Sequence, residues 1–238
     1  MSIMTIRKAN AERKLIDKKI TEFNKNININ SLSLVAYYRT SKPIIGLKTP
    51  KEVEEEIKSN WQRINDLFVR RGKLNDAVMK AMGGNLEPFS EDATNIVKVP
   101  SFKSLEYFSM DYSEYDLLSI SQAVARKKYF RDIVLELLNN IKRQVERYTS
   151  EFKKFSDRLD NELKSQVNAQ FGPESQQTAK QRVEYEQSIK PQYEATFIDP
   201  LKIQDKVEKV IEFVHNYIAE IDSIVSKATE TTDIEVAD

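Results

Sequence analysis

The chain contains a single histidine, His215, which lies three residues after Glu212. On a helix, a Glu-x-x-His pair supplies two ligands of the di-iron sites found in some helical bundles. Such a site needs a second pair and further carboxylates, and one histidine does not allow it. A Ser-His-Asp triad would also need His215, yet no Gly-x-Ser-x-Gly turn accompanies it. The sequence therefore predicts no metal site, no cofactor and no catalytic residues.

Other residues that could do chemistry have simpler interpretations. Glu54–Glu56 stand in the first turns of a predicted helix, where the helix dipole favours negative charge. Asp111, Glu114 and Asp116 could form an acid-base pair or a magnesium site, but such a site also requires burial and converging geometry. The glycine pair at 83–84 lacks the lysine and Ser/Thr of a phosphate-binding loop, so it predicts the end of a helix.

Basic side chains gather in two clusters that could contact phosphate or a protein partner. One cluster lies near the start of a long predicted helix, and the other lies on the helix before it. Clusters of this size are also common as solvated faces or as partners of acidic residues on neighbouring helices, and the balanced net charge favours that interpretation. The residues of the two clusters are Arg70, Arg71, Lys73, Arg126, Lys127, Lys128 and Arg131.

Composition limits the class of protein. The 238 residues include 37 basic and 37 acidic side chains, and this balance differs from the positive charge of a dedicated nucleic-acid binder. The absence of cysteine excludes disulfides and thiolate chemistry and favours a reducing cytoplasm. Residues 1–20 lack the apolar core of a secretory signal, and no apolar run approaches the roughly 20 residues of a membrane span. We therefore expect a cytoplasmic protein without membrane contact.

One long helix is the strongest structural prediction. Apolar residues recur every three or four positions, which indicates a helix from about Leu117 to Gln170 with one continuous apolar stripe. Other helices must cover this stripe. Because only five glycines occur, a fold dominated by tight turns is disfavoured, and we expect a mainly α protein: a long-helix bundle or coiled coil with a small β hairpin or ribbon. The stripe consists of Phe130, Val134, Leu137, Ile141, Val145, Tyr148, Phe152, Phe155, Leu159 and Leu163.

Three further helices are predicted. The first covers Thr5–Asn24 and is amphipathic. The second begins at Thr49–Glu52, where a threonine cap, a proline at the first helical position and a glutamate form a capping box, and it continues to Gly83. The last helix opens at Asp199–Pro200, an N-cap residue followed by a proline at the first helical position. Its three apolar columns are too wide for a two-stranded coiled coil, so we expect it to pack in a bundle, antiparallel to the long helix.

The remaining segments are less periodic. Residues 32–38 have β-like character and could pair with a strand in the irregular stretch that follows the second helix. Gly172 and Pro173 predict the end of the long helix. The predicted organisation is a single elongated helical domain, 1–238, with small β or irregular insertions at 27–47 and 85–116, a polar helical arm at 171–191 and a flexible tail at 229–238.

Three stretches resemble a family of small helical bacterial and phage proteins of uncharacterised function, some of which carry the name septicolysin. Ala9–Ile20 is similar to the family's first helix, and Ile120–Phe130 to its Ala-x-x-Arg-Lys/Arg helix start. Glu220–Ile234 is similar to the closing pattern, keeping an aspartate and two threonines but lacking its asparagine and tryptophan. The resemblance implies a small helical protein and brings no catalytic residues with it.

These observations predict a non-enzymatic structural or assembly protein that acts through helix-mediated protein–protein contacts. A phage virion or assembly component fits this description, because abundant lysine, asparagine and isoleucine are a hint of an AT-rich genome. The expected partner is the chain itself, in a homo-oligomer, or another structural protein, and the expected location is the cytoplasm of a bacterial host or the virion. The alternative is a nucleic-acid-associated accessory protein that uses the two basic clusters, and a metalloenzyme is the third hypothesis.

Overall fold

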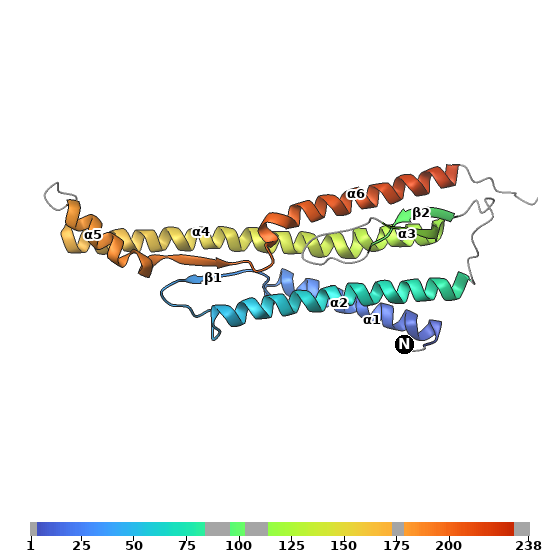
Figure 1. Cartoon of the computed structure of the whole chain (residues 1–238), viewed down its shortest axis with the longest axis horizontal. Coiled ribbons are helices and arrows are strands. Elements are labelled where there is room, and N and C mark those ends of the chain that lie inside the picture. The colour runs from blue at the N-terminus through green and yellow to red at the C-terminus, as the bar shows by residue number, and fades with distance from the viewer. Residues whose placement is uncertain (1–3, 84–95, 103–113, 173–178, 231–238) are drawn as a thin grey trace, which may run out of the picture. The chain divides into compact units, whose positions relative to one another are not determined.

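The computed structural model describes residues 4–83, 96–102, 114–172 and 179–230, which form helices and two small sheets (Figure 1). This confirms the mainly α fold with a small β component. The helices are α1 (Ile6–Asn28), α2 (Pro50–Gly83), α3 (Ile120–Tyr129), α4 (Leu135–Phe171), α5 (Ala179–Ile189) and α6 (Ile203–Glu230). A π-helical turn, η2 (Phe130–Val134), joins α3 to α4, and a 3-10 turn, η4 (Lys190–Tyr193), follows α5. The strands are β1 (Ala36–Arg39), β2 (Ile96–Pro100), β3 (Tyr115–Ser119) and β4 (Ala195–Ile198).

The chain divides into two compact units. Unit 1 consists of Met1–Leu32, Gln62–Lys142 and Asp205–Asp238, and unit 2 of Ser33–Trp61 and Arg143–Gln204. The single elongated domain predicted over residues 1–238 stays a prediction.

The predicted long helix is confirmed: α3, η2 and α4 form one helix of 52 residues. It starts at Ile120 rather than at Leu117, because Leu117 belongs to β3 and pairs with Lys98 of β2. A capping box marks the true start. The Ser119 hydroxyl accepts from the Gln122 backbone N–H at 3.3 Å, and the Gln122 side chain accepts from the Ser119 N–H at 2.8 Å. At the other end Gly172 has φ +73° and its N–H donates to the Asn168 carbonyl, so the predicted glycine stop is correct.

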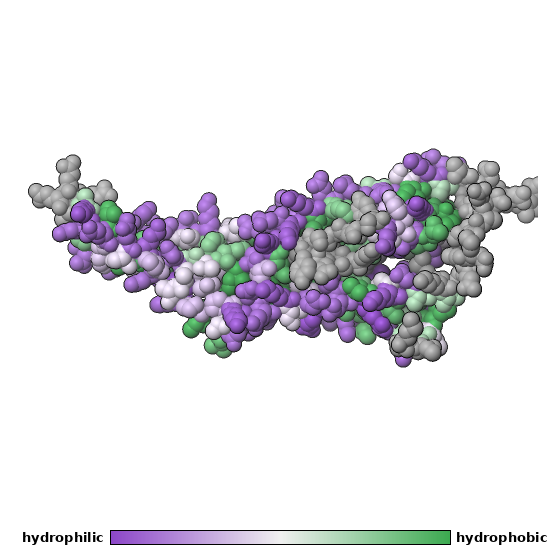
Figure 2. Space-filling model, viewed as in Figure 1, coloured by the Kyte–Doolittle hydropathy of each residue, from purple (hydrophilic) through white to green (hydrophobic). Residues whose placement is uncertain are grey.

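The apolar stripe of this helix is covered along both units. In unit 1, Phe130, Val134, Leu137 and Ile141 are at most 2% exposed. In unit 2, Val145, Leu159 and Leu163 are buried. The three aromatic members between them are half-buried around the Tyr37 ring of β1, with ring centroids 5.5–6.2 Å apart for Tyr148, Phe152 and Phe155. On the face seen in Figure 2, the outer sides of α4 and α6 are mostly hydrophilic, as expected for amphipathic helices.

In unit 1, α6 runs antiparallel to the long helix, as predicted. Lys142 forms an ion pair with Glu208 near the start of α6, and Lys127 forms one with Asp222 near its end. Two of the predicted apolar columns supply the buried side chains, and the third column, which includes Ile211, is half-buried. The buried residues of α6 in this unit are Val207, Val210, Val214, Tyr217 and Ile221.

The start of α6 differs from the prediction by a few residues. The helix begins at Ile203, so Pro200 lies in a turn before it. The Asp199 carboxylate still satisfies the free helix N–H groups, accepting from Ile203 and Gln204 at 2.9 Å each. The cap residue was therefore predicted correctly, but a turn that places Lys202 at φ +55° separates it from the helix.

The predicted strand pairing is wrong. In the described part of the irregular stretch after α2, residues 96–102 and 114–119, no residue pairs with residues 32–38. Instead β1 pairs antiparallel with β4, and β2 pairs antiparallel with β3. The β2–β3 pair joins segments close in sequence, which lowers the entropy cost of closing the loop. Strand β4 follows the predicted polar arm, and its four residues give too short a pattern to recognise from sequence.

The predicted insertions, arm and tail contain short elements of secondary structure. The insertion at 27–47 begins inside α1, which extends to Asn28, and then contains β1. The insertion at 85–116 contains β2 and the start of β3, with its remainder outside the described residues. The arm at 171–191 contains α5, none of whose residues is buried. Of the tail at 229–238, the first two residues are helical and the others lie outside the described residues.

The buried stripe predicts where substitutions matter. Ile141→Ala should lower the free energy of unfolding by about 2–5 kcal/mol, because the fully buried side chain leaves a cavity. Glu136→Ala, at an exposed position on the same helix, is the control and should change it by less than about 0.5 kcal/mol. Urea unfolding followed by circular dichroism measures both. Similar values for the two variants would mean that the stripe is not covered.

Candidate functional site

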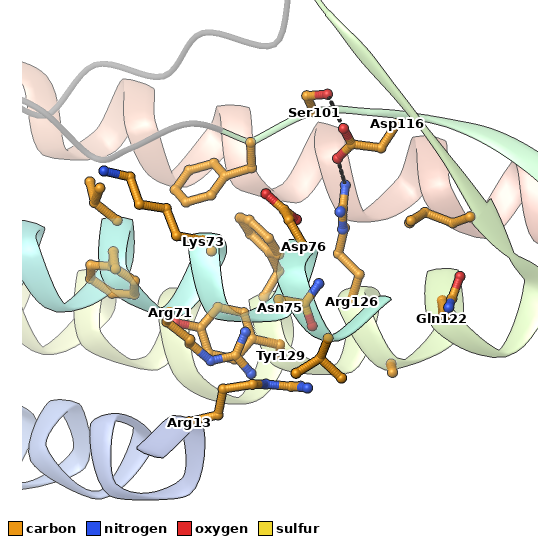
Figure 3. Close-up of a pocket in the computed structure, with 18 of the residues that line it drawn as sticks. Arg13, Arg71, Lys73, Asn75, Asp76, Ser101, Asp116, Gln122, Arg126 and Tyr129 are labelled. Carbon is orange, nitrogen blue, oxygen red and sulfur yellow. Dashed lines mark hydrogen bonds and ion pairs between the residues drawn. The ribbon is translucent and has the colours of Figure 1, made fainter. Parts of the chain in front are cut away.

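A cavity of about 630 Å³ lies within unit 1 (Figure 3). Its walls come from α1, α2, the β2–β3 pair and the region where α3 meets the π turn η2. This volume is in the range of pockets that hold small organic molecules. The cavity combines an apolar floor with several charged side chains.

The floor of the cavity is aromatic and aliphatic. The rings of Phe102 and Phe130 meet edge to face at 4.8 Å, and Phe68 meets Tyr129 at 6.5 Å in the same way. Phe130 is the first residue of the π turn, a rare geometry that is frequent at functional sites. Gly72 of α2 also lines the cavity, and a Cβ added there would meet no atom within 4 Å. The cavity therefore offers unfilled space beside an apolar surface.

One side of the cavity carries a closed polar network. Arg126 donates to the Asp116 carboxylate at 2.6 Å and to the Pro100 carbonyl at 3.3 Å, and Ser101 donates to the same carboxylate at 2.6 Å. The hydroxyl of fully buried Tyr217 donates to the Pro100 carbonyl at 2.8 Å. Burial raises the pKa of Tyr217 to about 12, although the charge of Arg126 acts in the opposite direction. These contacts tie the β2–β3 pair to α3 and α6.

The opposite side carries two guanidinium groups around one carboxylate. Arg71 donates to Asp17 at 2.5 Å, and its guanidinium carbon lies 3.4 Å from the centre of the Tyr129 ring (Figure 3). Arg13 reaches the same region from α1 and donates a hydrogen bond to the Asn10 side chain at 3.3 Å. Burial and the charge of Arg71 lower the pKa of Arg13, whereas Asp17 opposes the shift. The Nε of Arg13 and the hydroxyl of Tyr129 are buried without a hydrogen-bond partner.

The structure separates the seven basic residues singled out in the sequence. Arg71, Lys73 and Arg126 line the cavity. Five of the seven hold acidic partners, and Lys73 and Lys128 form no ion pair with a residue of the described part. The five pairs are Arg70–Glu12, Arg71–Asp17, Arg126–Asp116, Lys127–Asp222 and Arg131–Asp132.

The other candidate residues do not form one site. Glu212 and His215 are both exposed on α6. Glu114 and Asp116 line the cavity, whereas Asp111 lies outside the described residues. Over the ranges that the structure describes, no group of three or more His, Cys, Asp or Glu side chains could hold a metal ion. Nothing in the sequence singles out Arg13 and Tyr129, because the local pattern around each residue does not show that α1 and α3 lie at the same cavity.

A second surface lies in unit 2, between β1 and α2. We call residues Ile44–Leu47 the apolar turn. Leu47 is fully exposed and Ile44 is 67% exposed, while Gly46 adopts φ +64° at the tip. Figure 2 shows a hydrophobic projection in this region among hydrophilic residues. Local sequence gave no reason to single the turn out, because exposure depends on the surrounding fold.

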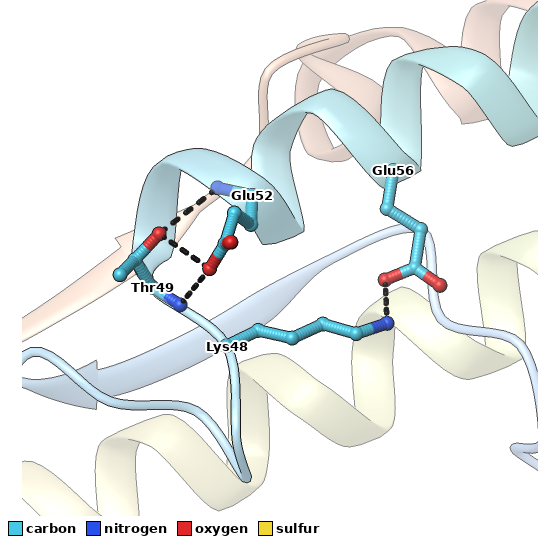
Figure 4. Close-up of polar contacts among 4 residues, drawn as sticks. All are labelled: Lys48, Thr49, Glu52 and Glu56. Carbon is cyan, nitrogen blue, oxygen red and sulfur yellow. Dashed lines mark hydrogen bonds and ion pairs between the residues drawn. The ribbon is translucent and has the colours of Figure 1, made fainter.

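The apolar turn is anchored at both ends. Before it, Ser41 donates to the Gln192 carbonyl at 2.8 Å, and inside it the Ile45 N–H donates to the Lys48 carbonyl at 2.9 Å. After it, the predicted capping box is present: the Glu52 carboxylate accepts from the Thr49 N–H at 2.7 Å, which also lowers the pKa of Glu52 (Figure 4). Lys48 donates to Glu56 at 2.6 Å. These contacts hold the backbone of the apolar turn on both sides.

Comparison of the chain with known proteins finds no matching family model, no matching curated protein and no matching solved structure. The resemblance to the family that includes proteins named septicolysin therefore stays a prediction. In the described part of the chain, no helix is both long enough and apolar enough to cross a membrane. The cavity and the apolar turn are thus interpreted from their own chemistry.

The raised pKa of Tyr217 predicts a loss of stability in alkali. The folded state keeps this proton up to about pH 12, while the unfolded chain releases it near pH 10. Stability from this group is therefore fully present below pH 10 and lost as the pH rises toward 12, by an amount of the order of 2 kcal/mol. Guanidinium unfolding across this range should show a smaller decline for Tyr217→Phe than for the wild type. Tyr115→Phe, at an exposed site, should decline like the wild type.

Proposed function

We propose that this chain is a non-enzymatic structural or assembly protein that acts through protein–protein contacts, with a second copy of itself as the first partner. A phage virion or assembly component is one example of this class. The observation that carries the proposal is the apolar turn: two aliphatic side chains are held in water by a backbone that is anchored on both sides.

Burial of the apolar turn against a partner would be favourable in free energy. Full burial of an aliphatic side chain of this size contributes about 1.5–3 kcal/mol, which Leu47 and Ile44 do not gain in the isolated chain. A flexible loop would lose conformational entropy on binding, whereas a turn already held in one conformation loses less. Anchored aliphatic side chains at the tip of a turn are therefore well suited to insertion into a partner.

Charge supports association between copies. The chain has 37 basic and 37 acidic residues, so two copies carry no net charge that would keep them apart. The polar helix α5 adds a second exposed surface in unit 2, with Val183 half-exposed at its centre. It is attached to α4 through the Phe171–Tyr185 ring contact at 5.4 Å and through Arg182, which donates to the Gly172 carbonyl at 3.0 Å.

Nucleic-acid binding is the alternative from the sequence, and the side-chain contacts support it less well. Five of the seven basic residues already hold a carboxylate, which competes with phosphate for the same donors. Lys73 and Lys128 are too few to form a salt-sensitive binding surface by themselves.

Light scattering after size exclusion tests the proposal. The wild type should show a mass above the 27.6 kDa of one chain that rises with concentration, because burial of the apolar turn drives association. Ile44→Ser combined with Leu47→Ser should shift the protein toward one chain while leaving thermal unfolding unchanged, since neither side chain is buried. Leu15→Ser, which removes a half-exposed leucine of unit 1, is the matched control and should associate like the wild type. A wild type that stays monomeric, or a double variant that associates equally well, would contradict the proposal.

A further inference from the structure

We propose that the cavity of unit 1 binds a small organic monoanion, a carboxylate with an aromatic or aliphatic body. This inference is independent of the apolar turn, which lies in the other unit. It depends on three features of the cavity: its apolar floor, the two guanidinium groups that share one carboxylate at one end, and an exposed lysine that forms no ion pair with a described residue.

The floor determines the body of the ligand. Phe68 and Phe130 are less than 5% exposed, and Phe102 continues the same aromatic surface. Flat or aliphatic groups gain most from such a surface, because burying apolar area on rings is favourable and aromatic groups can also meet ring edges. The open space beside Gly72 leaves room for this body.

The charges at the cavity determine the head group. Four cationic side chains line it, Arg13, Arg71, Lys73 and Arg126, and the carboxylates beside them are Asp76, Glu114 and Asp116 on the lining and Asp17, which holds Arg71. Asp116 is held by Arg126 and Ser101, and Asp76 and Glu114 have interaction partners of their own. The cations that keep positive charge available are Lys73, which forms no ion pair in the described part of the chain, and Arg13, which shares Asp17 with Arg71. An anion is therefore preferred over a cation or a neutral group.

Hydrogen bonding points the same way. Each guanidinium group has five N–H donors, and within the described residues Arg71 directs two of them to Asp17 while Arg13 directs one to Asn10. A carboxylate head group brings acceptors and negative charge together, and charge-assisted hydrogen bonds to guanidinium groups are among the stronger ones. Figure 3 shows Arg13, Arg71 and Tyr129 drawn together at one end of the cavity, with Lys73 above them.

The three carboxylates also limit the charge of the ligand. A phosphate monoester carries more than one negative charge at neutral pH and would meet Asp76, Glu114 and Asp116 across the same cavity. A monoanion can contact Lys73 and Arg13 and meets less repulsion from these carboxylates. We therefore infer a carboxylate rather than a phosphate.

Isothermal titration calorimetry on the full chain at neutral pH tests this inference with three probes of one shape: naphthoate, naphthyl methanol and naphthyl phosphate. Naphthoate should bind at least about tenfold more tightly than the neutral alcohol, and more tightly than the phosphate. The advantage over the alcohol should shrink as salt is added, because part of it is electrostatic.

Two variants that should preserve the fold test whether the ligand binds in this cavity. Lys73→Gln removes an exposed cation and should weaken naphthoate binding about threefold or more, with little effect on the alcohol. Gly72→Leu places a side chain in the open space and should weaken both probes, while its higher helix propensity keeps α2 folded. Lys128→Gln, an exposed lysine of α3 that does not line the cavity, is the matched control and should leave all three affinities unchanged. Absence of naphthoate binding to the wild type, equal affinity for acid and alcohol, tighter binding of the phosphate, or a Lys73→Gln affinity equal to that of the wild type would each overturn the inference.

Discussion

Burial of the apolar stripe on the helix from Ile120 to Phe171 is the constraint on which the rest of the structure depends. Each fully buried aliphatic or aromatic side chain contributes about 1.5–3 kcal/mol to the stability of the fold. Leaving a stripe of this length exposed to water would therefore forfeit a large part of the free energy of folding. In unit 1 the stripe is covered as α6 packs antiparallel beside it. In unit 2, Tyr37 of β1 and Phe197 of β4 supply the cover, which explains why two short strands are kept beside a helix.

Hydrophobic burial is non-directional, and buried polar contacts determine where each segment lies along the helix. In unit 1 the Asn140 side chain donates to Asn24 of α1 at 2.6 Å, and both residues are nearly fully buried. In unit 2 the buried Gln144 side chain accepts from the backbone N–H of Leu34 at 3.0 Å. A shift of α1 or of the segment before β1 by one turn would leave these groups without partners, which is costly in a low-dielectric interior.

Part of the balanced charge forms ion pairs within the chain. Basic residues that look like two clusters in the sequence are distributed among acids on other elements, as Arg71 is with Asp17 and Lys127 with Asp222. Two features stand out among the described residues: the cationic side chains Arg13, Arg71 and Lys73 at the cavity of unit 1, and the exposed aliphatic side chains of the apolar turn of unit 2. These two features lie in different units and concern different chemistry, so each can be tested without the other.

The sequence by itself determined the main helices, several of their ends and the apolar stripe, because these depend on residue spacing and on contacts within a few positions. The Ser119 cap and the start of α6 at Ile203 were not predicted. Thr49 and Glu52 form the expected capping box, and Gly172 ends the long helix. The π turn at Phe130, the partners of the strands, the cavity and the exposure of Leu47 were decided only by the tertiary structure. The strand pairing and the cavity arise where segments far apart in the chain meet, as Arg71 meets Tyr129. The periodicity of one segment carries no information about its contact with another.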